Sequence, residues 1–153
     1  MPVPLAARFD IIGHVHTSVP DDDIARRRRE LVSVVEILPA YADGLTGIEA
    51  YSHLIVLFWM DRATAPAGMR CHPRGDTTLP EVGVFAARGR NHPNPIGLAV
   101  VELLARNDNR LTVRRLDAFD GTPIIDIKPY DHYDSICDPR VPDWFRRRAL
   151  RQT

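Results

Sequence analysis

A carboxylate and an ammonium lie two residues apart in the apolar stretch LDAFDGTPIIDIKPYDHYD (116–134). Successive side chains of a strand point to opposite faces, so Asp126 and Lys128 are expected to share a face with Ile124. Such a face must contact water or line a polar pocket, because burying either charge unpaired costs several kcal/mol. Lys128 is the only lysine among 20 Lys and Arg residues, which favours a site that needs a compact ammonium. Tyr130 continues this polar cluster; a structural ion pair on an exposed face is the alternative.

A second stretch, ARGRNHPNPIGLAVVELL (87–104), predicts a stiff loop that presents backbone groups. Asn94 lies between two prolines, and the proline that follows it restricts its backbone. Gly97 permits a tight turn or a close approach by another group. Arg88 and Arg90 flank the loop. We interpret the loop as part of a binding site, with a rigid structural turn as the alternative.

Two further polar positions lie at the ends of predicted strands. The turn DGTP (120–123) can offer free amides and a hydroxyl to a ligand. Asp61 and Arg62 follow the apolar strand SHLIVLFWM (52–60). An acid and a base in that place can belong to a site, and they are equally typical of an ordinary strand edge.

The sequence contains no G-x-S-x-G, no P-loop and no G-x-G-x-x-G after a strand, so a Rossmann-type cofactor site is not supported. A metal site is the competing hypothesis, because His14 and His16 point to the same side of a strand. Cys71 and Cys137 are far apart in sequence and form no C-x-x-C motif. We therefore predict no metal. A third ligand would have to come from His53, His72, His92, His132 or a cysteine.

Arginines form two runs, Arg26 to Arg29, and Arg146 to Arg148 with Arg151, although the net charge is zero. Such clusters can bind phosphates, and that binding weakens as salt is added. A solvated face neutralised by the acidic run Asp21 to Asp23 is the alternative.

Short runs of β-branched and aromatic residues between turn formers predict a mainly β fold. We expect a small closed or nearly closed barrel of about seven strands with short helices, including a C-terminal helix within 141–153. The sequence NDN at 107–109 predicts a hairpin. The Pro- and Gly-rich stretch 62–80 is a long connection that can serve as a lid, a dimer arm or a disordered segment. The candidate strands are 8–17, 30–38, 52–60, 81–88, 97–106, 110–117 and 122–130.

Length and composition favour a single domain over residues 1–153, because 44% hydrophobic and 26% charged residues suit a folded core. No apolar run approaches the roughly 18–20 residues of a membrane span. The N-terminus MPVPLAARFD has no apolar segment typical of a secretory signal. Two cysteines are too few for a disulfide framework, so a reducing cytoplasm is expected.

Three stretches together, YADGLTGIEAYSHLIVLFWMD, HPNPIGLAVVELL and DGTPIIDIKPY, resemble the TsaA-like family, whose characterised members are the TrmO tRNA methyltransferases. The resemblance runs from about Ile11 to Asp134. It implies a small β-barrel that binds S-adenosylmethionine (SAM), and a homodimer with the cofactor pocket near the subunit interface. The implied activity is methylation of N6 of N6-threonylcarbamoyladenosine beside the tRNA anticodon, so the anticodon stem-loop is the implied partner.

The resemblance also implies roles for individual residues. Asp126, Lys128 and Tyr130 match the family's D-I-K-P-Y signature and are the implied catalytic residues. In that role Asp126 accepts the hydrogen bond or proton of N6 as a general base, and Lys128 fixes Asp126 or binds the substrate carboxylate. The implied cofactor-binding residues are Asp61, Arg62, Arg88, Asn94, Ile96, Gly97, Leu98, Asp120, Gly121, Thr122 and Pro123.

The chain departs from the family pattern in two places. Ser18, Val19 and Pro20, followed by acidic residues, replace the family's Gly-x-Pro-Arg-Gln loop, and His92 stands where the family has arginine. Two alternatives to the tRNA reaction therefore stay open. One is the same SAM pocket acting on a small molecule or another RNA; the other is a non-enzymatic SAM- or metal-binding barrel.

Overall fold

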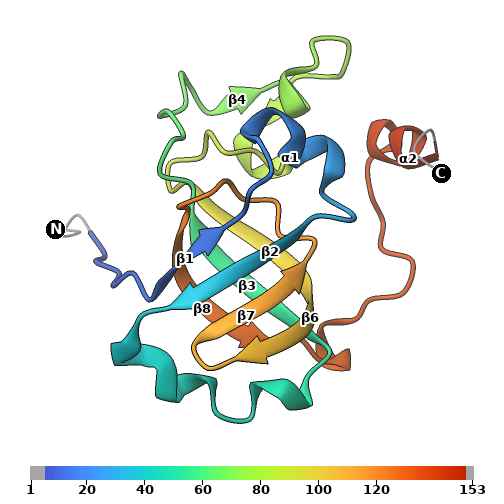
Figure 1. Ribbon diagram of the computed structural model, residues 1–153. Helices are drawn as coiled ribbons and strands as arrows, with labels where there is room; N and C mark the ends of the chain where they lie inside the picture. Colours follow the sequence, from blue (N-terminus) through green and yellow to red (C-terminus); the bar gives the residue numbers. More distant parts are fainter. Residues whose placement is uncertain (1–5, 151–153) are drawn as a thin grey trace, which may run out of the picture.

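The computed structural model describes residues 6–150 and has a closed antiparallel barrel at its centre (Figure 1). Neighbouring strands follow the order β1-β2-β7-β6-β3-β8, and β8 pairs with β1 to close the barrel. The predicted mainly β barrel is confirmed, with six strands instead of about seven. These strands are β1 (Gly13–His16), β2 (Val32–Ile37), β3 (His53–Trp59), β6 (Ile96–Asn107), β7 (Arg110–Arg114) and β8 (Pro123–Pro129).

Alternating side chains fill the barrel interior. Along β3, Leu54, Val56 and Phe58 point inward and are at most 4% exposed, while Ile55 and Leu57 lie on the outer face. Valine, leucine and isoleucine suit such a surface because branched side chains pack well on a pleated sheet. The core therefore follows directly from the period-two pattern of the sequence. Other members of the core cluster are Val15, Val35, Ile37, Leu45, Val101, Leu111, Val113, Leu116, Ala118 and Ile124.

The barrel closes through a short pairing that we call the seam. Strands β1 and β8 share two residue pairs, Gly13 with Ile124 and His14 with Pro123. By contrast, β3 pairs with β6 along all seven of its residues. Gly13 also pairs with β2 on the other side of β1. A side chain on Gly13 would overlap the backbone carbonyl of Glu36, so glycine is required for β1 to approach β2 beside the seam.

The candidate strand at 81–88 is wrong in its extent. Only Val82–Gly83 (β5) is extended, and it pairs with Arg70–Cys71 (β4) in a separate two-stranded sheet. The chain then turns through the 3₁₀ helix η4 (Val84–Ala86). Val84 is buried and Phe85 is 76% exposed, so the stretch lacks the alternate inner face that a barrel strand needs. The hairpin predicted at 107–109 is confirmed between β6 and β7.

A register shift changes the predicted faces of β8. Leu57 pairs with Asp126, and the next residue of β3, Phe58, pairs with Ile124, so one residue of β8 bulges. Ile124 is therefore buried in the core while Asp126 and Lys128 lie together outside. The expectation that Ile124 shares their face is wrong, because an unrecognised bulge shifts the alternation by one residue.

Short helices cover the two ends of the barrel (Figure 1). Helix α1 (Asp21–Arg27) was not predicted; it is anchored by Ile24, which is 1% exposed. The predicted C-terminal helix is confirmed as α2 (Asp143–Leu150), whereas Arg151 lies outside the described residues. The remaining 3₁₀ helices are η1 (Pro39–Leu45), η2 (Ile48–Ala50), η3 (Pro73–Gly75) and η5 (His132–Asp134).

The two ends of the barrel have different coverings. We call the end where β1 and β3 finish the α1 end, and the opposite end, where β2 runs into η1, the η1 end. Within residues 6–150, no helix combines the length and apolar character needed to cross a bilayer.

Candidate functional site

The residues implied to bind the cofactor come from three segments that meet at the α1 end. Trp59, the last residue of β3, pairs with Ile96, the first residue of β6. The amide of Met60 donates to the carbonyl of Pro95 at 2.8 Å, which ties the end of β3 to the proline-rich loop. The turn at 120–123 leads into β8 at the same end. The barrel thus brings together positions that are up to 62 residues apart in sequence.

Arg62 connects these segments. Its Nη1 lies 2.6 Å from Oδ2 of Asp21 in α1, and its Nη2 donates to the carbonyl of Asp120 at 3.1 Å. The guanidinium also lies 5.3 Å from the ring centroid of Phe119, at cation–π distance. Arg62 therefore holds α1 and the 120–123 turn in place, and it uses much of its donor capacity within the protein. Asp61 is exposed beside it.

Backbone hydrogen bonds hold the 120–123 turn in place. The amide of Gly121 donates to the carbonyl of Val15 at 2.8 Å, and the amide of Thr122 donates to Phe119 at 3.2 Å. The expectation of free amides is therefore wrong for these two residues, because the turn uses them to join β1. Gly121 has a φ of +77°, which explains the glycine. The Asp120 carboxylate stays exposed and accepts a hydrogen bond from the amide of Thr17 at 3.0 Å.

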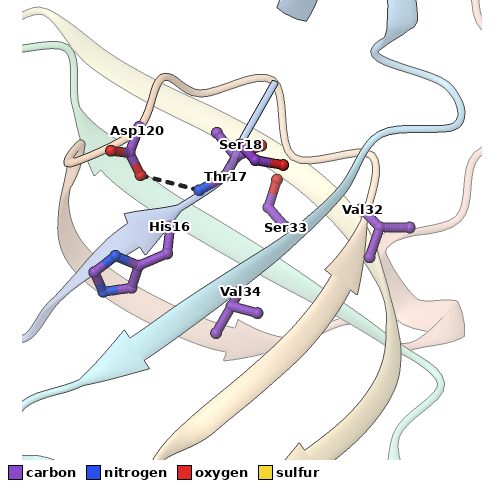
Figure 2. Close-up of a pocket in the computed structure, with 7 residues that line it drawn as sticks. All are labelled: His16, Thr17, Ser18, Val32, Ser33, Val34 and Asp120. Atoms are coloured by element: carbon purple, nitrogen blue, oxygen red, sulfur yellow. Dashed lines mark hydrogen bonds between the residues drawn. The ribbon is translucent and has the colours of Figure 1, made fainter. Parts of the chain in front are cut away.

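A shallow pocket of about 350 Å³ opens beside Asp120, between the end of β1 and the start of β2 (Figure 2). The Ser33 hydroxyl is buried on its wall and has no hydrogen-bond partner among residues 6–150. A buried polar group without a partner costs about 1–3 kcal/mol, so this oxygen is a place where a ligand can compensate. The pocket is lined by His16, Thr17, Ser18, Val32, Ser33, Val34 and Asp120.

The proline-rich loop is tied to the end of β3 through Met60, and its glycine packs against the core. A side chain on Gly97 would collide with the ring of Phe58, so the close approach expected here is made by the barrel interior. Arg88 donates to the carbonyl of Leu98 at 2.9 Å, and an imidazole nitrogen of His92 lies 3.0 Å from the carbonyl of Ala87. Asn94 is exposed. Ile96 and Leu98 project outward and are 43% and 48% exposed.

The three implied catalytic residues lie away from the α1 end. Lys128 Nζ is 2.9 Å from Asp126 Oδ2 in a partly exposed ion pair. Asp126 is three residues beyond Pro123, about 10 Å along the strand. Tyr130 lies at the η1 end, where its amide donates to the carbonyl of His53 and its ring packs edge-on to that histidine. One chain therefore holds two separate groups of predicted residues.

A second pocket, of about 430 Å³, lies at the η1 end against the seam. Asp126 lines its wall together with Tyr41 and Tyr51, whose rings are about 40% exposed. The aliphatic residues that line the pocket are Ile12, which precedes β1, Ile37 of β2, Leu45 of η1, Ile48 of η2 and Ile127 of β8. Sequence analysis did not identify this pocket, because it depends on how η1 and η2 fold across the barrel end.

Sequence analysis also missed three residues that shape the α1 end. Asp21 was taken as a neutralising charge for the arginine run, but it pairs with Arg62. Ser33 lies within the predicted strand 30–38, and Phe119 lies between the predicted strands 110–117 and 122–130; neither residue gives a sign of a site in the sequence. Only the acidic run at 21–23 offered a sequence signal, since acidic residues favour a helix N-terminus.

The histidine pair does not gather further metal ligands among the residues that the structure covers. His14 lies opposite Glu36 in the β1–β2 pairing, and His16 Nε2 is 3.8 Å from Glu36 Oε1. Within residues 6–150, no group of three or more His, Cys, Asp or Glu side chains is arranged to hold a metal ion. Cys71 and Cys137 are not bonded to each other.

A small antiparallel barrel with polar loops gathered at one end defines a ligand-binding β-barrel domain. Residues 16–135 match the family described as the tRNA-methyltransferase O N-terminal domain, and the chain belongs to that family. The resemblance inferred from the three sequence stretches is thereby confirmed.

Named relatives agree with this assignment. An S-adenosyl-L-methionine-binding protein of Archaeoglobus fulgidus is 50% identical over 111 residues, which cover 71% of this chain and 78% of the relative. A longer relative from the same organism, named a probable S-adenosyl-L-methionine-binding protein, is 49% identical over 112 residues. That match covers 72% of this chain and 30% of the relative.

The fold agrees with a solved structure. The crystal structure of TrmO from Pseudomonas aeruginosa superposes with a TM-score of 0.72 at 29% sequence identity. The match covers 91% of this chain and 63% of that one. The chain thus spans under two thirds of the TrmO chain that it resembles.

Proposed function

We propose that this chain is a cytoplasmic SAM-dependent methyltransferase that methylates N6 of N6-threonylcarbamoyladenosine beside the tRNA anticodon. The observation that carries the proposal is the convergence of the family's loops at one barrel end, where Arg62 joins them. Family membership and the names of the Archaeoglobus relatives support SAM as the cofactor. The alternatives are a small-molecule or different RNA substrate for the same pocket, and a barrel that binds SAM without catalysis.

The residues at the α1 end fit such a cofactor in chemical terms. SAM carries a sulfonium and an ammonium, and the exposed Asp61 and Asp120 carboxylates suit these cations. The exposed side chains of Ile96 and Leu98 offer apolar surface for an adenine ring. The unpartnered Ser33 hydroxyl can donate to or accept from a bound group.

When bound, SAM would supply an electrophilic methyl group on sulfur, so the protein need form no covalent intermediate. The chain's own residues then have to align the N6 amine with that methyl group and exclude water. The N6 lone pair is delocalised and weakly basic. We assign Asp126 to accept the N6 proton, and Lys128, 2.9 Å away, to hold that carboxylate in position.

A homodimer reconciles this role with the position of Asp126. The outer side chains of β3 and β6 form an apolar ladder in which Ile55 pairs with Val100, Leu57 with Leu98 and Trp59 with Ile96. Trp59, Ile96, Leu98 and Val100 are each at least 40% exposed, which is typical of an interaction surface. We call these six residues the outer apolar ladder.

We assign a second copy of this chain to the ladder. Leu57 lies opposite Asp126, and Ile55 opposite Lys128, so the ion pair borders the ladder directly. A twofold axis across the ladder would set the ion pair of one subunit near the α1 end of its partner. The catalytic and cofactor groups would then belong to different subunits of one site.

Calorimetry with SAM, S-adenosylhomocysteine and ATP tests the first part of the proposal. We expect micromolar binding of the first two ligands and none of ATP. Transfer of labelled methyl to tRNA that carries the threonylcarbamoyl group, and not to tRNA that lacks it, would support the substrate. Equal transfer to both would favour another RNA substrate, and SAM binding without any methylated RNA would favour a small-molecule substrate or a non-catalytic barrel.

Asp126→Asn tests the general base. It should bind SAM normally and lower kcat by about 100-fold or more, the usual contribution of a general base. Asp108→Asn, in the exposed turn between β6 and β7, is the matched control and should keep full activity. Unchanged turnover in Asp126→Asn would remove this carboxylate from the mechanism.

A further inference from the structure

Three arginines from separate parts of the sequence meet beside the α1 end. Arg28 directly follows α1, Arg74 lies in η3, and Arg148 lies in α2. Nη1 of Arg148 is 3.8 Å from Oδ2 of Asp76, which places α2 against the η3 segment. Figure 1 shows α1, α2 and the segment around β4 on the same half of the molecule. We call Arg28, Arg74 and Arg148 the arginine junction.

The charges at the junction act on one another. The pKa of Arg74 is lowered, first because neighbouring atoms displace water from its guanidinium, and then because Arg28 and Arg148 repel its charge. Asp117 acts in the opposite direction on the same group. Arg148 thus lies beside the carboxylate of Asp76, and Asp117 is the carboxylate that stabilises the charge of Arg74.

The carboxylates do not pair with the whole junction. Over residues 6–150, Arg148 is the only member of the three in an ion pair, and that pair is long at 3.8 Å. Arg28 and Arg74 form no ion pair and no hydrogen bond through their side chains within this part of the chain. By contrast, Arg26 and Arg27 of the same run pair with Asp23 and Glu30. The sequence alternative of a neutralised face therefore holds for part of the run and not for Arg28.

Like charges repel, so a fold that brings three arginines together leaves a site for an anion. Guanidinium groups match phosphate oxygens in a bidentate geometry, and they retain their charge at every physiological pH. Clustered arginines of this kind bind a phosphate more strongly than isolated surface arginines, because their fields add.

The position of the junction indicates which phosphate it binds. Helix α1 connects it to the cofactor end: Asp21 at the start of the helix pairs with Arg62, and Arg28 follows its last residue. Seven helical residues span about 10 Å, so the junction lies about that distance from the Arg62 network. A nucleic acid whose base enters the cofactor end would extend its backbone over that distance.

We propose that the arginine junction binds the phosphate backbone of the RNA whose base is methylated at the α1 end. The inference rests on the proposed function, since it specifies how the RNA substrate is held. Helix α1 and the arginine run from Arg26 to Arg29 follow the place of the family's Gly-x-Pro-Arg-Gln loop, and α2 lies beyond the residues 16–135 that match the family. Arg28 and Arg148 therefore come from segments in which this chain differs from the family pattern or extends beyond it, whereas Arg74 lies within the matched residues.

The test measures binding of a fluorescent anticodon stem-loop RNA to the full chain across a series of salt concentrations. Arg28→Gln and Arg74→Gln should each bind about fivefold more weakly and reduce the slope of log affinity against log salt by about 1. Arg110→Gln is the matched control, because Arg110 pairs with Glu36 toward the η1 end. It should leave both the affinity and the slope unchanged.

Asp76→Asn gives a test that a folding defect cannot imitate. This change keeps all three arginines and removes a carboxylate beside them, and the asparagine still offers an acceptor to Thr78. RNA should then bind more tightly, by about two- to fivefold, with an unchanged or steeper salt slope. Unchanged or weaker binding would contradict the junction.

Separate measurements distinguish this inference from the proposed function. If neither the unmodified chain nor any variant binds SAM, the proposed function fails. The RNA titrations would still test the arginine junction. If Arg28→Gln, Arg74→Gln and Arg110→Gln all weaken RNA binding equally, attraction is only by net charge and the junction is refuted. If the junction variants lose affinity for inorganic phosphate but keep the RNA slope, the site binds a small anion and the assignment to RNA is wrong.

Discussion

Gly97→Ala should destabilise the barrel strongly, because its side chain would enter space that Phe58 already fills. A Cβ at this position would lie 2.6 Å from Cδ2 of the Phe58 ring, with two further ring carbons closer still. Carbon atoms in van der Waals contact are about 3.5–4.0 Å apart, so the ring must move by well over about 1 Å to clear the closest ring carbons. Phe58 is 4% exposed in the core and has little room to do so. Overpacking of this kind costs about 1–3 kcal/mol, and the severe overlap favours the upper end.

Urea denaturation of the purified protein measures this cost. Gly89→Ala is the matched control, because a Cβ on Gly89 meets no atom within 4 Å, and it should change stability by less than about 0.5 kcal/mol. Adding Phe58→Leu to Gly97→Ala should recover about 1 kcal/mol relative to the sum of the single changes, because the smaller side chain removes the overlap. If Gly97→Ala keeps full stability but loses SAM binding, the glycine serves the cofactor and the packing argument is wrong.

Three further predictions concern the candidate site, the loss of stability at low pH and the proposed dimer. Ser33→Ala should leave the free energy of unfolding unchanged or raise it by up to about 1 kcal/mol in urea titrations, because the hydroxyl has no partner among residues 6–150. The same change should weaken SAM binding in calorimetry. A clear loss of stability would contradict this prediction. The pKa of Glu49 is lowered by its own backbone amide and then by Arg106, so its stabilising contribution is present above the usual glutamate pKa and is lost as the pH falls through the lowered value. Glu49→Gln should therefore make the melting temperature fall less steeply as the pH is lowered into the acid range. An unchanged fall would refute this role of Glu49. Leu98→Glu in the outer apolar ladder should give monomers in sedimentation velocity experiments without loss of the barrel's circular dichroism, and a persisting dimer would place the interface elsewhere.

The fold was largely predictable because burial in a barrel follows a period of two. The runs that became β2, β3, β6 and β7 carry that pattern plainly, and the hairpin at 107–109 carries its own turn residues. The run at 81–88 has a similar composition but buries only Val84 fully. Composition alone does not tell whether a short apolar run has a neighbouring strand to pair with.

The site was predictable in its parts and less so in its arrangement. The loop at 94–98 and the turn at 120–123 lie at one barrel end, each tied to the residues that follow β3. The bulge in β8 was not predictable, because it depends on the register with β3. Helix α1 was missed as well, since seven residues are too few to show a helical period and Ile24 alone anchors it.

The separation of the predicted residues into two groups also could not be predicted from the sequence alone. Asp126 and the 120–123 turn are neighbours along the chain, and a reader of the sequence places them in one site. The strand carries the carboxylate about 10 Å away, onto an outer face. Only the arrangement of two subunits would restore the proximity that the sequence suggests.

The strands of the barrel are not joined equally firmly, because the seam between β1 and β8 is shorter than the pairing of β3 with β6. Two residue pairs hold this line, flanked by backbone hydrogen bonds from Ile12 to Ile124, from Val15 to Thr122 and from Gly121 to Val15. Seven residue pairs hold β3 to β6, so opening the seam breaks fewer backbone hydrogen bonds than separating β3 from β6. Ile12, Ile37 and Ile127 lie at the η1 end of the seam, where the second pocket enters between them. Amide protons along β1 should therefore exchange with solvent before those of β3 and β6. The closed barrel is therefore expected to begin to open along the β1–β8 pairing, beside the pocket at the η1 end.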